Sequence, residues 1–142
     1  MIGGFRVQRL PAWLVVLWIG MGVLFGGNVL GGQTPPAPKM PAHWKVVSDY
    51  PVPAEQVKAM SSKIGADLSG VRNTIYDVNG KRVQINVIVA ADPGHAEKLM
   101  TYLRSMKAED ALLRKELVVY EFVGKNDVLA VIAEGRRHLN SI

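Results

Sequence analysis

Apolar and polar residues alternate most regularly between residues 81 and 90, and this alternation predicts a β-strand. Asn79-Gly80 comes directly before the segment. A two-residue hairpin loop of type I′ needs positive φ at both central residues, and Asn-Gly adopts that conformation readily. We therefore predict a hairpin whose first strand begins near residue 71. The loop length sets the register, since Val78 then pairs with Lys81 and Tyr76 with Val83.

Two segments carry apolar residues at every third or fourth position and predict amphipathic helices. The first covers residues 53–64, with Pro53 in its first turn and Gly65 at its C-terminal end. The second follows Asp92, a residue type that caps helix N-termini, and covers residues 92–107. The apolar stripes consist of Val57, Met60 and Ile64 in the first helix and Ala96, Leu99, Met100, Leu103 and Met106 in the second.

Four other segments complete the domain. The apolar segment around residues 44–47 and the β-branched and aromatic segment 117–123 are typical of strands. Residues 107–116 fit either a helical extension or a charged loop. Residues 127–139 fit either a helix or a strand. We favour a helix, because Asn126 can cap its start and basic residues stand at its C-terminal end.

The predicted element order is β-α-β-β-α-β followed by a helix. This order is typical of the ferredoxin-like split βαβ arrangement, an α/β (α+β) sandwich with an antiparallel sheet and helices on one face. One N-terminal hydrophobic helix is expected to precede it.

The strand registers predict a sheet face that the helices leave open. If Val83, Ile85 and Val87 face the helices, the residues between them face outward. Asn73 then lies opposite Asn86. A face of amides and aliphatic side chains suits a polar ligand, a peptide or a second sheet, and the alternatives are a solvated face or one covered by the C-terminal helix. The candidate ligand-binding residues are Asn73, Ile75, Gln84, Asn86, Ile88 and Glu121.

The only long apolar run lies near the N-terminus, at residues 13–32, after Arg6 and Arg9. It fits either a cleaved export signal or a retained membrane anchor, because residues 12–30 as a helix would span about 28 Å. We favour the anchor, because the segment has no Ala-x-Ala cleavage site, although its glycines weaken the helical end. In either case the basic N-terminal side stays in the cytoplasm and the rest of the chain lies outside it.

Three regions follow from this pattern. Residues 1–32 are predicted to be a signal peptide or transmembrane anchor. Residues 33–42 contain four prolines and predict a semi-rigid, extended linker. Residues 43–142 are predicted to form one extracytoplasmic α/β domain, which is large enough to bury a core.

Composition narrows the chemistry of this domain. The chain has 142 residues and no cysteine, which excludes disulfides, thiolate metal sites and a cysteine nucleophile. The net charge of +5 includes Arg6 and Arg9, so the remainder is only about +3. The charges are mixed in sign, unlike a nucleic-acid-binding surface. We predict no catalytic residue, no metal site and no cofactor. His95-Ala96-Glu97 matches part of a zinc deaminase motif, but the cysteines of that motif are missing.

One family resemblance concerns residues 78–103, "VNGKRVQINVIVAADPGHAEKLMTYL". This segment is similar to the second half of the peptidoglycan-binding sporulation-related repeats of bacterial cell-division proteins. Those domains also lie outside the membrane after an anchor and a linker. The Gly-x-Phe pattern that they carry after a strand is missing here. The resemblance implies a cell-wall ligand.

The sequence therefore predicts a non-enzymatic extracytoplasmic binding or accessory domain, either anchored to the membrane through residues 12–30 or periplasmic or secreted after cleavage. A cell-envelope polysaccharide or a protein partner is expected, and no nucleic acid. The alternatives are a peptidoglycan-binding module and a small envelope hydrolase or transferase whose site has no sequence signature.

Overall fold

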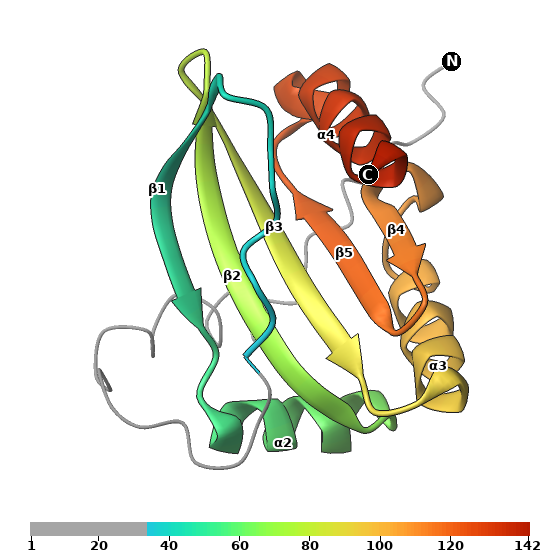
Figure 1. The fold of residues 1–142 in the computed structure, drawn as a ribbon. Coiled ribbons are helices and arrows are strands. Elements are labelled where there is room, and N and C mark those ends of the chain that lie inside the picture. The colour runs from blue at the N-terminus through green and yellow to red at the C-terminus, as the bar shows by residue number, and fades with distance from the viewer. Residues whose placement is uncertain (1–33) are drawn as a thin grey trace.

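The computed structural model describes residues 34–142, which form a mixed α/β domain around one five-stranded antiparallel sheet (Figure 1). The predicted N-terminal hydrophobic helix, with the expected signal or anchor at residues 1–32, lies outside the described residues. The elements are β1 (Trp44–Pro51), α2 (Ala54–Ile64), β2 (Leu68–Val78), β3 (Lys81–Ala90), α3 (Pro93–Arg104), the 3₁₀ turn η1 (Glu109–Ala111), β4 (Leu112–Lys115), β5 (Val118–Val123), the 3₁₀ turn η2 (Asn126–Val128) and α4 (Leu129–Ser141).

The central hairpin is formed as predicted. Asn79 and Gly80 have φ angles of 54° and 84°, and the Gly80 amide donates to Asp77 Oδ1 over 2.9 Å. The predicted pairs of Val78 with Lys81 and of Asn73 with Asn86 are both present. The pattern of the hairpin therefore determines which residues share a face of the sheet.

The ferredoxin-like strand order is not found. The sheet has the order β1-β2-β3-β5-β4, and β1 pairs directly with β2 in antiparallel orientation. In a split βαβ unit the strands that flank a helix are parallel, with another strand between them. Helix α2 lies across one end of the sheet instead of along it, so the chain re-enters beside β1 from that same end (Figure 1).

The second half of the chain does contain a split unit. β5 is antiparallel both to β3 and to β4, so β3 and β4 run parallel with β5 between them. β4 lies in the segment that the sequence left undecided between helix and loop. Its two leucines point to opposite faces, since Leu112 and Leu113 belong to different core clusters. The turn to β5 contains Glu116 with a φ of 56°.

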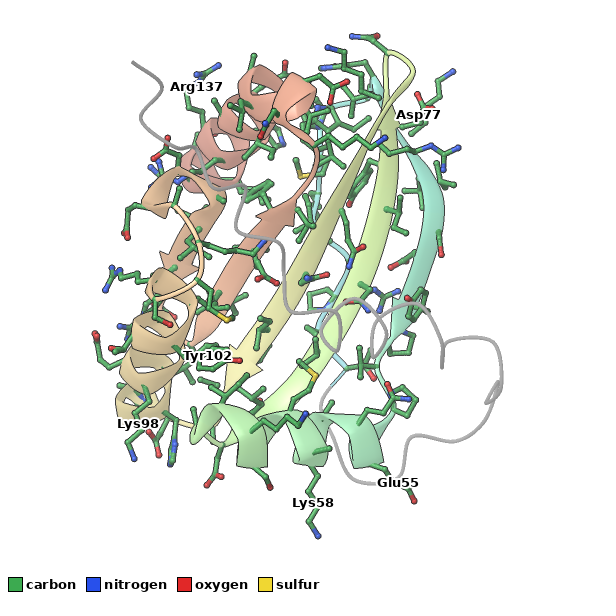
Figure 2. All side chains as sticks on the ribbon, turned by 180° about the vertical axis from the view of Figure 1, so that it is seen from behind. Glu55, Lys58, Asp77, Lys98, Tyr102 and Arg137 are labelled. Atoms are coloured by element: carbon green, nitrogen blue, oxygen red, sulfur yellow. The ribbon has the colours of Figure 1, made fainter. Side chains whose placement is uncertain are left out.

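Helices cover both faces of the sheet, which corrects the prediction that they lie on one face. The face that carries Val83, Ile85 and Val87, here called the front face, packs against α4, and the opposite back face packs against α2 and α3 (Figures 1 and 2). The front core contains Trp44, Tyr76, Val78, Phe122, Val128, Ile132 and Leu139, and the back core contains Val57, Met60, Val71, Ile88, Leu99, Met100, Leu103 and Val119.

The predicted signals at two helix ends are confirmed. Gly65 ends α2 with a φ of 75°, and Asp92 caps α3 by accepting from the His95 amide over 2.8 Å. The C-terminal segment is a helix, as favoured, but Asn126 does not cap it, because α4 begins only after η2. Arg136 Nε instead anchors α4 to the sheet by donating to the Leu112 carbonyl over 2.8 Å.

Residues 34–41, here called the proline segment, run in extended form over the front face (Figure 1). The sequence predicted a spacer there. In the structure Pro35 is buried, and Met40 packs against the front core. Within residues 34–142, no helix has both the length and the apolar character needed to cross a membrane.

Candidate functional site

The predicted site residues share the back face, where the side chains of Gln84, Asn86, Glu121 and Lys107 are connected by polar contacts and Asn73 lies beside them. Asn86 Nδ2 donates to Glu121 Oε1 over 2.7 Å, and Gln84 Nε2 donates to Asn86 Oδ1 over 2.7 Å. Asn86 and Glu121 are paired across β3 and β5, and Asn73 is paired with Asn86 from β2. We call Asn73, Gln84, Asn86, Lys107 and Glu121 the buried polar cluster.

The face that carries this cluster is not open. Asn73, Asn86 and Glu121 each expose 1% or less of their surface, and Ile88 belongs to the core under α2 and α3. The prediction of an open face is therefore wrong, although the grouping of the residues is right. Only Ile75 and Gln84, which pair with each other across the hairpin, are partly exposed.

Lys107 brings a positive charge to the cluster from the loop after α3. Its Nζ lies 3.5 Å from Glu121 Oε2, with side-chain exposures of 11% and 1%. The same Nζ donates to the Phe122 carbonyl over 3.4 Å. A buried carboxylate needs such partners, because moving a lone charge out of water is strongly unfavourable. Glu121 is thus held between an amide and an ammonium group.

Asn73 differs from the other cluster residues. It lies in the middle of β2 with no exposed surface, yet neither Oδ1 nor Nδ2 has a hydrogen-bond partner among residues 34–142. A buried amide without partners destabilises a fold by about 1–3 kcal/mol, so such groups are uncommon in native proteins. The amide nitrogen and oxygen of Asn73 therefore remain unpaired beside Asn86 in the interior.

Tyr102 on α3 is half-buried and packs against the back core (Figure 2). Burial raises the pKa of its phenol, and the negative charge of Glu121 adds to this effect. The hydroxyl therefore stays protonated at neutral pH and can donate a hydrogen bond. Sequence reasoning missed both Tyr102 and Lys107. Tyr102 occupies a position next to the predicted apolar stripe of α3, and this position was the only signal for it.

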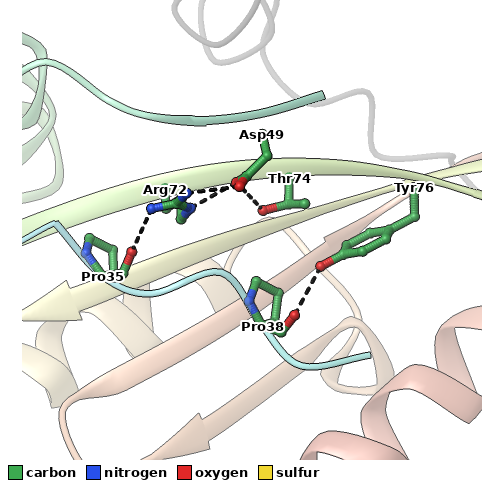
Figure 3. A network of polar contacts seen from close by, with 6 residues as sticks. All are labelled: Pro35, Pro38, Asp49, Arg72, Thr74 and Tyr76. Atoms are coloured by element: carbon green, nitrogen blue, oxygen red, sulfur yellow. Dashed lines mark hydrogen bonds and ion pairs between the residues drawn. The ribbon is translucent and has the colours of Figure 1, made fainter. Parts of the chain in front are cut away.

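The front face carries a second polar network, which the sequence did not indicate (Figure 3). Arg72 makes a two-pronged contact with Asp49, with Nε–Oδ1 and Nη2–Oδ2 distances of 2.7 and 2.8 Å. Thr74 Oγ1 donates to Asp49 Oδ1 over 3.0 Å. The hydrogen bond from Arg72 holds the pKa of Asp49 below its ordinary value. Arg72 Nη1 and the hydroxyl of Tyr76, which lies on the same face of β2, donate to carbonyl groups of the proline segment.

The histidines serve structural contacts. His95 Nδ1 accepts from the Asp67 amide over 2.9 Å and so connects α3 to the loop after α2. In the described part of the chain, no three His, Asp or Glu side chains are grouped as a metal ion would require.

Comparisons with protein-family models, with curated proteins and with solved structures found no match.

Proposed function

We propose that this protein is a non-enzymatic binding or accessory module that works outside the cytoplasm, and that the back face of its sheet recognises a ligand containing amide groups. The observation that carries the proposal is the Asn73 side chain. It is buried without a hydrogen-bond partner, beside Asn86, whose side chain makes two hydrogen bonds. An amide group in a ligand offers a matching acceptor and donor.

The neighbouring groups fit the same class of ligand. Gln84 is a partly exposed member of the cluster, and its cross-strand partner Ile75 is also partly exposed, so the rim offers one polar and one aliphatic contact. Ligand sites commonly combine apolar walls with a few fixed polar groups. N-acetylated cell-wall polysaccharide and its peptides contain the required amides, in agreement with the family resemblance of residues 78–103. Peptidoglycan is therefore the first ligand to test.

A cell-wall pull-down with the full chain tests this proposal. Wild type should be retained more strongly than a charge-matched control protein, and Asn73→Leu should lose most of that retention. Asn140→Leu, the same change at an exposed position on α4, should bind like wild type. Equal retention of Asn73→Leu and wild type would contradict a site at Asn73.

The cellular location of the protein is tested by a separate experiment. The apolar sequence predicted to be an export segment at residues 1–32 supports a domain that is outside the cytoplasm and anchored through residues 12–30. Fractionation and intact-mass measurement of the expressed protein should find the whole chain in the membrane fraction. A mature chain that begins near Gly32 or Gln33 would instead indicate a cleaved signal and a periplasmic or secreted protein.

One observation favours a hydrolase or transferase as the second candidate. Glu121 and Lys107 bring a carboxylate and an ammonium group within 3.5 Å of each other in a buried setting, and such pairs can serve in proton transfer. Incubation with cell-wall material would distinguish the two functions. Release of new reducing ends or free amines by wild type, and not by Glu121→Gln, would support the enzyme.

A further inference from the structure

Two carbonyl groups of the proline segment are bound by side chains of one strand. Arg72 Nη1 donates to the Pro35 carbonyl over 3.2 Å, and the Tyr76 hydroxyl donates to the Pro38 carbonyl over 3.2 Å (Figure 3). Arg72 and Tyr76 are both on β2 and point to the same front face, since the strand alternates with a period of two.

The spacing of the two carbonyls matches a polyproline helix. That helix has three residues per turn, so carbonyls at positions i and i+3 point in the same direction, about 9 Å apart. Pro35 and Pro38 have this spacing in the sequence Pro-Pro-Ala-Pro. The Cα atoms of the two donor residues are about 13 Å apart along an ideal strand. The long Arg72 side chain covers the difference.

Both donors are held in place by residues outside the proline segment. Asp49 fixes the Arg72 guanidinium through two hydrogen bonds. The Tyr76 ring is buried and packs edge-on against Trp44 with 5.5 Å between the ring centroids. Fixed donors lose little conformational freedom on binding, and this favours recognition of a segment that is itself stiff.

Further contacts lie just beyond Pro38. His138 Nε2 is 2.9 Å from the Lys39 carbonyl, and because a carbonyl can only accept, this nitrogen carries the proton. Met40 packs into the front core beside Trp44 and Gly135. The surface therefore contacts the carbonyls of two prolines that are three positions apart. It also binds the backbone carbonyl of the residue after the second proline, and the apolar side chain of the residue after that.

We propose that this front-face surface, formed by Arg72, Tyr76, Trp44 and His138, is a binding site for proline-rich peptides in polyproline conformation, and that the proline segment occupies it in cis. The polar contacts involve backbone carbonyls, so a proline-rich peptide that already holds the polyproline conformation can make them at little conformational cost, whereas a flexible peptide of alanines cannot. Recognition of proline-rich segments by aromatic-lined surfaces is a recurring mode of peptide binding. The partner is a proline-rich peptide of another chain, which exchanges with the tethered segment.

Tethering determines the affinity that such a partner experiences. A segment joined directly to the domain is present at an effective concentration in the millimolar range. A free peptide must compete with it and binds weakly until the tethered segment is displaced. Weakening the tethered segment should therefore open the site, while the donors on β2 remain unchanged.

Fluorescence anisotropy of a labelled peptide, TPPAPKMPA, tests the proposal with the full chain in detergent micelles. We expect Pro35→Gly/Pro38→Gly to bind the peptide at least tenfold more tightly than wild type. Adding Tyr76→Phe, which removes only the hydroxyl donor, should weaken that binding severalfold. A control peptide with alanine at every proline should not bind. Equal anisotropy for the two peptides with the double-glycine variant would overturn the proposal.

A second measurement on the wild-type chain covers the case in which the double-glycine variant does not fold. Trypsin cleavage after Lys39 reports release of the tethered segment. An excess of TPPAPQMPA, which trypsin cannot cut, should accelerate this cleavage severalfold, and the alanine peptide should not. Cleavage at the same rate with and without the proline peptide would mean that the segment is only a packed N-terminal extension.

Discussion

The two faces of the sheet both bury polar groups under packed elements, but they differ in how those groups are satisfied. On the front face, Arg72 and Tyr76 have partners in β1 and in the proline segment. On the back face, Asn73 has none. Among the described residues, the buried side-chain atoms without a hydrogen-bond partner all lie on the back face. On the front face the chain therefore provides hydrogen-bond partners from its own proline segment. On the back face it provides none for the Asn73 amide.

The largest effect is expected where the back face buries charge. Glu121→Leu removes the partner of Lys107 and of the Asn86 amide, and leaves an ammonium group that is only 11% exposed. Breaking a buried ion pair from one side destabilises a protein by about 3–5 kcal/mol. Urea denaturation should show that the free energy of unfolding falls by this amount.

The matched control for this change is the double variant Glu121→Leu/Lys107→Met. It removes both charges and should recover most of the lost stability, because apolar replacement of a buried ion pair is often close to neutral. If the free energy of unfolding of Glu121→Leu were within about 1 kcal/mol of wild type, the ion pair would not stabilise the back face as expected.

Close packing on the front face is tested by Gly135→Ala. A Cβ atom at this position would lie 2.5 Å from Trp44 Cη2. The ring cannot easily move, since it is buried and its Nε1 donates to Glu134 Oε1 over 2.9 Å. Overpacking of this kind destabilises by about 1–3 kcal/mol, which should outweigh the better helix propensity of alanine. Thermal unfolding should show a lower Tm than for Asn140→Ala, an exposed control on α4; an equal or higher Tm would contradict the close contact.

Neighbouring residues of β2 provide the most direct test of the difference between the faces. Asn73 and Thr74 are adjacent, both fully buried and on opposite faces. Asn73→Leu should stabilise the protein by about 1–2 kcal/mol, because it removes an unsatisfied amide. Thr74→Val should destabilise it by about 1 kcal/mol, because Asp49 loses a hydrogen bond. Denaturation midpoints that shift in the same direction would show that the two faces do not differ in this way.

The sequence predicted the features that depend on local pattern. Asn79-Gly80 and the alternation that follows determined the hairpin register, and that register grouped Asn73 with Asn86 correctly. It did not show which helices cover which face, because the direction of α2 across the sheet end depends on tertiary packing. Lys107 was missed for the same reason. Its charge is typical of a surface loop, and only the assembled back face brings it to Glu121.

The smallest effect concerns pH and the front-face donor that contacts the proline segment. Burial raises the pKa of Tyr76 to about 12, while the unfolded phenol titrates near 10. Between these two values the folded state keeps a proton that the unfolded state has released. The stability associated with the neutral hydroxyl is therefore fully present below pH 10 and is lost as the pH rises toward 12.

Tyr76→Phe isolates this contribution, since it keeps the ring that packs on Trp44 and removes the hydroxyl that contacts Pro38. At pH 7 wild type should be more stable by about 1 kcal/mol. Urea denaturation at several values from pH 7 to 11.5 should show this difference shrinking above pH 10. Tyr102 and Tyr120 also have raised pKa values through burial, but they titrate in both proteins and cancel in the comparison. A difference that stays constant across this range would show that the Tyr76 hydroxyl is not buried beneath the proline segment.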